Sequence, residues 1–268
     1  MKSAQEQLEK LAKNQNEITG LATGFYDLDK LTSGLHENEL IIVAARPAMG
    51  KTAFALNLAV NAASKSDKAV ALFNLEMSAE QLAMRMIAAA GGIEMNKVRT
   101  GRLEHNDWKK VNEAMSELSE TNLYIEDNAG MTISEIRAKC RRLATSDKGL
   151  GLIVIDYLQL ISGSSKNEGN RVQEVSEISR SLKTMAMELK VPVVALAQLS
   201  RSVELRENKR PIMSDLRESG SIEQDADIVM FLYRDDYYNK AAAEQTDTSI
   251  TELIIGKHRN GGTGTIEL

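Results

Sequence analysis

The chain has 268 residues, of which 43% are hydrophobic and 26% charged, and its net charge is −5. This balance is that of an ordinary globular protein with enough residues to bury a core, and the acidic charge argues against a protein that coats nucleic acid with its whole surface. The N-terminus lacks the apolar core of a signal peptide and no apolar run approaches the length of a membrane span, so we expect a cytoplasmic protein without a membrane partner.

Residues 1–16 are polar and have a helical pattern with only a narrow apolar stripe. Such a stripe cannot support an independent fold. We therefore expect this segment to be a tether or a helix that docks on another surface, and we interpret the chain as a fragment of a longer protein.

From residue 17 onward, short apolar runs rich in β-branched residues alternate with helical patterns. Continuous apolar character predicts strands that are buried on both faces. The predicted strands are 40–45, 69–75, 123–127, 151–160, 191–198 and 227–234, and the predicted helices are 51–64, 78–90, 106–119, 132–145 and 171–190. The alternation predicts an α/β fold, with a mainly parallel, twisted sheet covered by helices on both faces. The pattern of residues 251–268 predicts a C-terminal β-hairpin, and the polar composition of residues 162–170 predicts a loop.

Local signals support two of these helices. Ser78 with Gln81, and Thr132 with Glu135, have the spacing of a capping box. The helix 132–145 also contains the only cysteine of the chain, Cys140, which excludes an internal disulfide and fits a reducing compartment. We expect a buried or neutral thiol there rather than a nucleophile.

The sequence ARPAMGKT occupies positions 45–52, between a predicted strand and a predicted helix, which is the context of a P-loop. Backbone N–H groups of such a turn surround phosphates at a helix N-terminus. Lys51 is expected to reach the β- and γ-phosphates, and the Thr52 hydroxyl to bind Mg²⁺. Ala45 stands where the first glycine of the motif usually lies. The expected nucleotide-binding residues of the loop are Arg46, Pro47, Ala48, Met49, Gly50, Lys51 and Thr52.

Three polar residues stand at the ends of other predicted strands. Asp156 has the position of a Walker B aspartate, which holds the metal ion, although an aspartate that caps the next loop is the alternative. Glu76 and Gln198 point to the same crevice, because ligands of such sheets bind at the carboxyl ends of the strands. Glu76 is a candidate base that orients the attacking water, and Gln198 is a candidate γ-phosphate sensor. Both could also be ordinary loop residues.

Several segments resemble the C-terminal domain of DnaB-type replicative helicases. They include NLEMSAEQLAMRM, VIDYLQLISG, SDLRESGSIEQDADIVMFLYRDDYY and KHRNGGTGTIEL, and the similarity runs from about residue 17 to the last residue. The resemblance implies a RecA-like fold and a homohexameric ring with ATP and Mg²⁺ bound between subunits. It also implies that residues 1–16 are a linker helix packed on the adjacent subunit, that 17–268 are the motor domain, and that a separate N-terminal domain is absent.

The same resemblance assigns roles to individual residues. Lys51 and Thr52 match the Walker A residues, and Glu76, Asp156 and Gln198 match the catalytic glutamate, Walker B aspartate and sensor. Lys257 and Arg259 match a basic pair that acts on the neighbouring subunit, with Arg259 as an arginine finger. Without the family resemblance, these two residues would be interpreted only as charged side chains of the predicted hairpin. The turn after them is NGGTG, where members of the family often have proline after the first glycine.

The resemblance further implies single-stranded DNA contacts in residues 162–171 and 200–220. Residues 200–217 contain five basic and three acidic side chains, a small positive excess on an acidic protein. Residues 199–220 contain no aromatic side chain, so we expect contacts to the DNA backbone rather than base stacking. A solvated charged loop is the alternative. The candidate DNA-binding residues are Arg201, Arg206, Lys209, Arg210, Arg217, Glu218 and Gly220.

Two other functions share some of these features. A RecA-like recombinase has the same ATPase core but forms filaments, and the LRESG and KHRNG segments favour the helicase. A module that binds ATP only to hold an assembly together needs no water-activating base, so Glu76 argues against it. For the helicase, the implied partners are primase and a helicase loader, through regions partly missing from this chain.

Overall fold

The computed structural model describes residues 18–163, 170–216, 220–239 and 249–268, so the predicted helix 1–16 lies outside the described residues. Within these ranges the strands form an eight-stranded sheet with the order β3-β2-β4-β5-β1-β6-β7-β8. The neighbours from β3 to β6 pair in parallel, and β7 and β8 pair antiparallel at one edge. The strands are β1 (Leu40–Ala45), β2 (Ala69–Asn74), β3 (Leu123–Glu126), β4 (Leu150–Asp156), β5 (Val193–Gln198), β6 (Ile228–Tyr233), β7 (Glu252–His258) and β8 (Gly264–Glu267).

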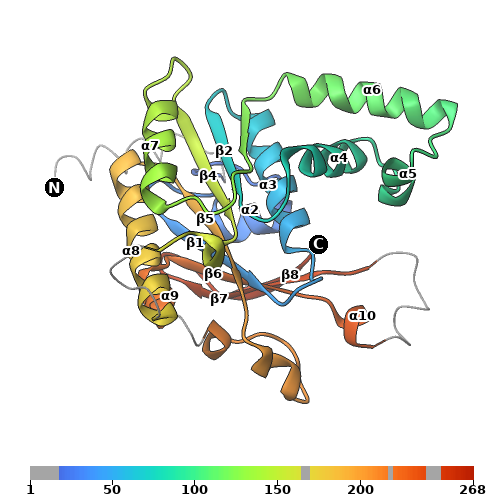
Figure 1. The fold of residues 1–268 in the computed structure, drawn as a ribbon. Coiled ribbons are helices and arrows are strands. Elements are labelled where there is room, and N and C mark those ends of the chain that lie inside the picture. Colours follow the sequence, from blue (N-terminus) through green and yellow to red (C-terminus); the bar gives the residue numbers. More distant parts are fainter. Residues whose placement is uncertain (1–17, 164–169, 217–219, 240–248) are drawn as a thin grey trace.

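Helices cover both faces of this sheet (Figure 1), as the sequence predicted. They are α2 (Tyr26–Thr32), α3 (Lys51–Lys65), α4 (Ala79–Ala90), α5 (Met95–Thr100), α6 (His105–Ser119), α7 (Ile133–Ala144), α8 (Arg171–Leu189), α9 (Gly220–Asp225) and α10 (Asp235–Tyr238). Both predicted capping boxes are present, at Ser78 before α4 and at Thr132 before α7. In the described part of the chain, no helix combines the length and apolar character needed to cross a membrane.

The two faces of each central strand belong to different apolar cores. In β1, Ile42 and Ala44 pack in the core on the α7 and α8 side, whereas Ile41 and Val43 pack in the core on the α3 and α4 side. All six residues of β1 are buried. Successive side chains of a strand point to opposite faces, which explains why the sequence shows a continuous apolar run instead of an alternation.

One predicted strand is too long. The run 151–160 leaves the sheet after Asp156, and Leu158–Leu160 form a short 3₁₀ helix, η1. The strand register explains why β4 ends at Asp156. Asp156 makes the last pair with β2, through Asn74, and among the described residues β4 has no pair with β5 beyond Ile155. Leu158 is buried in the apolar core beside α7 and α8. The apolar character after Asp156 thus serves core packing rather than a strand. The short helices α2, α5, α9 and α10 were not predicted.

Cys140 lies on α7, inside the apolar core, with none of its surface exposed. Burial raises the pKa of its thiol to about 12. Only the thiolate is nucleophilic, so at about pH 8 roughly one thiol in 10⁴ is reactive even where a reagent reaches it. We expect the native protein to resist iodoacetamide and the unfolded chain to be alkylated once, as mass spectrometry can measure. Alkylation of the native protein at the rate of a free thiol would contradict the buried position.

Candidate functional site

The phosphate loop connects the end of β1 to the start of α3. Positive φ angles occur at Ala48 (66°) and Gly50 (88°), and a Cβ on Gly50 would meet no atom within 4 Å. Its backbone angle, rather than lack of space, therefore favours glycine at this position. Ala45 belongs to β1 and pairs with Gln198 of β5. Because Ala45 is in extended backbone, this loop needs no glycine there.

The Walker A and Walker B candidates meet at the end of β4. The Thr52 hydroxyl donates to Asp156 Oδ2 over 2.6 Å, and Lys51 Nζ lies 3.9 Å from Asp156 Oδ1 and 4.2 Å from the centre of the Tyr157 ring. Burial raises the pKa of the Asp156 carboxyl, against the hydrogen bond from Thr52 and the charge of Lys51. Burial also lowers the pKa of the Lys51 ammonium, against the attraction of Asp156 and Glu76.

These groups fit a metal-bound polyphosphate. Asp156 Oδ1 is buried, lies 3.9 Å from Lys51 Nζ and accepts no hydrogen bond from any described residue, so this oxygen keeps a lone pair for a metal ion. In the described ranges, no three acidic, histidine or cysteine side chains could hold a metal ion by themselves. Mg²⁺ is commonly held by one or two carboxylates together with phosphate oxygens. Asp156 and Thr52 would hold the ion, and Lys51 would bind the phosphates.

A cavity of about 380 Å³ opens in front of these residues. It is within the size range of small-molecule sites. Glu76 and Gln198 both line it together with the phosphate loop, so the structure brings the two strand-end candidates to the same crevice.

Sequence reasoning missed Asn74, which joins two parts of this site. It is buried at the end of β2, and its Nδ2 donates to Asp156 Oδ2 over 3.3 Å. Its Oδ1 accepts hydrogen bonds from the backbone N–H groups of Glu76 (3.0 Å) and Met77 (2.7 Å). Asn74 therefore fixes the turn that carries Glu76 and connects it to the Walker B carboxylate. A polar residue that ends an otherwise apolar strand is the signal that could have identified it.

Arg46 differs from the other residues of the phosphate loop in what its side chain contacts. Its side chain is buried, and its guanidinium donates to the Leu199 carbonyl (2.8 Å) and to Glu204 (2.9 Å). It lines the cavity, but these contacts connect the loop to the segment after β5. Two further arginines, Arg85 of α4 and Arg234 after β6, also line the cavity and were not predicted. They reach the site through the packing of their elements, which no motif reveals.

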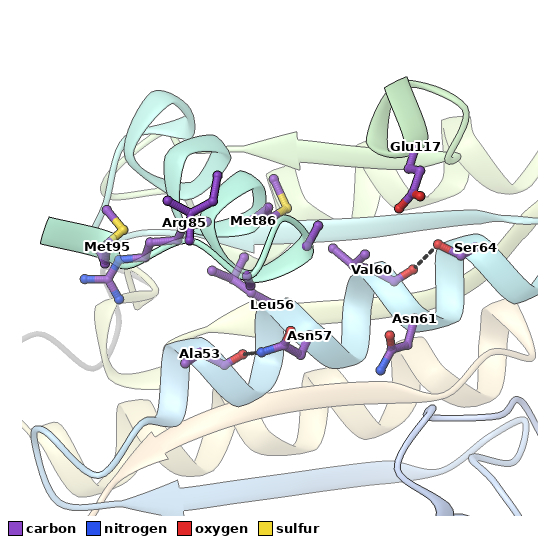
Figure 2. A pocket seen from close by; sticks show the side chains of 14 residues that line it. Ala53, Leu56, Asn57, Val60, Asn61, Ser64, Arg85, Met86, Met95 and Glu117 are labelled. Atoms are coloured by element: carbon purple, nitrogen blue, oxygen red, sulfur yellow. Dashed lines mark hydrogen bonds between the residues drawn. The ribbon is translucent and has the colours of Figure 1, made fainter. Parts of the chain in front are cut away.

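A second, larger cavity of about 780 Å³ lies between α3 and the pair α4 and α5 (Figure 2). Leu56, Val60 and Met86 give it an apolar lining, and Asn57 and Ser64 donate to carbonyls of their own helix. Lys51, Glu76 and Gln198, which line the smaller cavity, do not line it. The phosphate chemistry therefore belongs to the smaller cavity, although Arg85 lines both.

Lys257 of β7 and Arg259 after it lie at the C-terminal end of α9. Lys257 Nζ donates to the carbonyls of Glu223 (2.5 Å) and Ala226 (2.7 Å). Arg259 donates to the Gln224 carbonyl, and its Nη1 lies 3.6 Å from Asp227 Oδ1. Burial, followed by the charge of Arg259, lowers the pKa of Lys257. Neither residue lines the phosphate cavity of its own chain, and their action on a neighbouring subunit stays a prediction.

The candidate DNA-binding residues differ in what they contact. Arg206 forms two hydrogen bonds with the buried Asp215 (2.7 and 2.8 Å), and Arg210 pairs with Glu252 of β7 (2.9 and 2.5 Å). Lys209 Nζ lies 4.7 Å from the centre of the Tyr238 ring. These contacts hold the segment on the body of the protein. Arg201 is exposed and lines a neighbouring cavity, Gly220 begins α9, and Arg217 and Glu218 lie outside the described residues.

The fold and the site together define a P-loop nucleotide-binding protein. A phosphate loop joins β1 to α3, and a buried aspartate at the end of β4 contacts the residues that follow the loop. A family model described as "DnaB-like helicase C terminal domain" matches residues 20–268, and the chain belongs to this family.

The curated relatives are named replicative DNA helicases. The chain is 59% identical over 263 residues to the "Replicative DNA helicase DnaC" of Bacillus subtilis (strain 168) and to the "Replicative DNA helicase DnaB" of Geobacillus stearothermophilus. Each match covers 98% of this chain and 57% of the relative. The chain therefore spans little more than half the length of the curated relatives it matches.

Solved structures confirm the predicted RecA-like fold. One of them, described as an ATPase domain, superposes with a TM-score of 0.93 at 44% identity, covering 100% of this chain and 93% of that one. The chain described as "The Structure Of A DnaB-Like Replicative Helicase And Its Interactions With Primase" gives a TM-score of 0.91 at 43% identity, covering 100% of this chain and 63% of that one.

Proposed function

We propose that this chain is the ATP-driven motor of a replicative DNA helicase, which hydrolyses ATP to translocate on single-stranded DNA and unwind the duplex. The observation that carries the proposal is the contact of Thr52 and Lys51 with Asp156, in a domain whose curated relatives are named replicative DNA helicases. Glu76 supports turnover rather than binding alone, because it lines the same cavity. A cytoplasmic location belongs to the same proposal, and a single, buried cysteine fits it.

The residues of this chain would divide the reaction between them. Bound Mg²⁺ would neutralise charge on the phosphate oxygens. Lys51 and the N–H groups of the loop bind and orient the phosphates, and Glu76 orients the attacking water. Gln198 detects the γ-phosphate from the end of β5. Arg259 of a neighbouring subunit stabilises the charge that develops on the transferred group, with Lys257 beside it.

The assembly and partners belong to the same proposal. We propose a homohexameric ring in which residues 1–16 form a linker helix on the adjacent subunit and residues 17–268 form the motor. Single-stranded DNA passes the segment that contains Arg201, Arg217, Glu218 and Gly220. A primase and a helicase loader are the proposed protein partners, and one structural relative is described with its primase interactions.

The proposal predicts DNA-stimulated ATPase activity that depends on salt. Single-stranded DNA should raise turnover, and the apparent DNA affinity should fall at least about tenfold between about 50 and 200 mM salt, because phosphate contacts release counterions. Steady-state ATPase assays with and without oligothymidylate measure both effects, with Lys51→Ala as the inactive control. Turnover that ignores DNA, in a sample whose mass shows rings, would contradict the motor. Filaments on DNA in electron micrographs would favour the recombinase.

A further inference from the structure

The side chain of Gln159 forms hydrogen bonds with both backbone groups of Gln198. Its Nε2 donates to the Gln198 carbonyl over 3.2 Å, and its Oε1 accepts from the Gln198 N–H over 3.2 Å. Gln159 lies in η1, three residues after Asp156, and Gln198 is the last residue of β5. The ladder between β4 and β5 ends at Ile155 and Ala195. The Gln159 amide therefore replaces the backbone partner that β5 loses when β4 ends.

The opposite edge of Gln198 is held by the phosphate-loop strand. Gln198 pairs with Ala45 of β1, and the next N–H group, of Leu199, donates to the Ala45 carbonyl over 3.1 Å. The backbone at Gln198 thus lies between the phosphate loop on one side and the Gln159 amide on the other. The Gln198 side chain is exposed in the cavity. Its direction depends on how firmly this backbone is held.

Gln159 also contacts the element that follows the polar stretch after η1. Arg171, the first residue of α8, donates to the Gln159 carbonyl and pairs with Glu174 over 2.7 Å. A cavity of about 480 Å³ adjoins this contact and is lined by Gln159, Arg171 and Arg201, among others. Gln198 lines both this cavity and the phosphate cavity. Gln159 therefore lines one cavity and is hydrogen-bonded to the residue, Gln198, that lines both.

We propose that Gln159 is a positioning residue for the γ-phosphate sensor. Its side-chain amide fixes the backbone of Gln198, and this backbone sets the direction of the sensor side chain. Its backbone carbonyl accepts a hydrogen bond from Arg171, which connects the sensor to α8. The inference rests on the proposed function, because it needs Gln198 to detect the γ-phosphate. An amide is required: methionine has a similar length but offers neither the donor nor the acceptor.

The test compares Gln159→Met with Gln198→Ala and with the double variant. Gln159→Met should lower kcat about 10- to 100-fold, since misplacement of a group that acts on the transition state has effects of this size. It should change the ADP affinity less than about twofold, because the γ-phosphate is absent from ADP. The preference for ATPγS over ADP should fall to that of Gln198→Ala. The double variant should be no slower than Gln198→Ala alone, because the two residues act as a unit.

Two controls separate positioning from folding. Gln173→Met makes the same replacement at an exposed position of α8 and should keep wild-type kinetics. The Tm of Gln159→Met should stay within about 4 °C of the wild type, a shift that corresponds to about 1 kcal/mol in a chain of this size.

The outcomes are distinguishable. Normal kcat and normal ATPγS preference in Gln159→Met, with both impaired in Gln198→Ala, would overturn the positioning role and leave the sensor intact. A Gln198→Ala variant with normal kcat and normal ATPγS preference would overturn the sensor, and the positioning role with it. Additive losses in the double variant would show that Gln159 acts elsewhere. The nucleotide affinities decide the matter even where turnover is too slow to measure.

Discussion

Replacement of Lys51 with alanine is expected to reduce ATP turnover by about 10²–10³-fold or more, because one electrostatic donor aimed at developing charge contributes this much. Lys51 lines the phosphate cavity, and its Nζ lies 3.9 Å from Asp156 Oδ1. No lysine or arginine elsewhere in the phosphate loop can replace it, because the guanidinium of Arg46 is held by Leu199 and Glu204. A coupled phosphate-release assay with saturating Mg-ATP measures the loss.

The fold should survive this replacement. Burial lowers the pKa of Lys51, which shows that its charge is already disfavoured in this position. Asp156 keeps its hydrogen bonds from Thr52 and Asn74. Lys65→Ala is the matched control, because Lys65 is an exposed lysine in the last turn of the same helix, α3, and should retain turnover. Wild-type turnover in Lys51→Ala would show that the phosphate cavity is not the catalytic site.

The central sheet could be predicted because its strands are buried on both faces and therefore appear as uninterrupted apolar runs. The same signal led to a wrong strand prediction for residues 157–160, because Leu158 is apolar for its packing in the core beside α7 and α8. Apolar runs report burial, and only pairing with neighbours decides whether a buried segment is a strand. The short helices α5 and α9 have too few turns to produce a period that could be recognised.

The residues of the site also fall into those that the sequence could predict and those that it could not. Lys51, Thr52 and Asp156 could be brought together from sequence because the carboxyl ends of parallel strands meet at one edge. Asn74 was missed although it is a polar residue at the end of an apolar strand, whereas Gln159 could not be predicted, since it contributes through a turn whose geometry depends on the neighbouring strand. Arg85 enters the cavity from α4, and its position depends on how that helix packs. Residues fixed by the topology were predictable, and residues fixed by packing were not.

Replacement of Arg259 with alanine is expected to lower turnover by about 10³–10⁵-fold, the range measured for arginine fingers, while nucleotide binding is retained. Arg259 is absent from the phosphate cavity of its own chain, and its side chain is 47% exposed beside Asp227 and the end of α9. We therefore expect Arg259 to assist catalysis from a neighbouring subunit. Arg259→Lys should not restore activity, because an ammonium lacks the planar pair of donors. Arg102→Ala, at an exposed arginine after α5, is the control that should remain active.

Mixing two inactive variants tests the neighbouring subunit directly. Glu76→Gln lacks the base but keeps the finger, and Arg259→Ala lacks the finger but keeps the base. In rings assembled from equal amounts of both, about a quarter of the head-to-tail interfaces combine an intact Glu76 with an intact Arg259. Turnover should therefore recover to a measurable fraction of the wild type, and only after the subunits have been allowed to exchange. A mixture that forms rings of normal mass and stays as inactive as its components would place the action of Arg259 within its own chain. Loss of rings in Arg259→Ala alone would instead assign Arg259 to assembly.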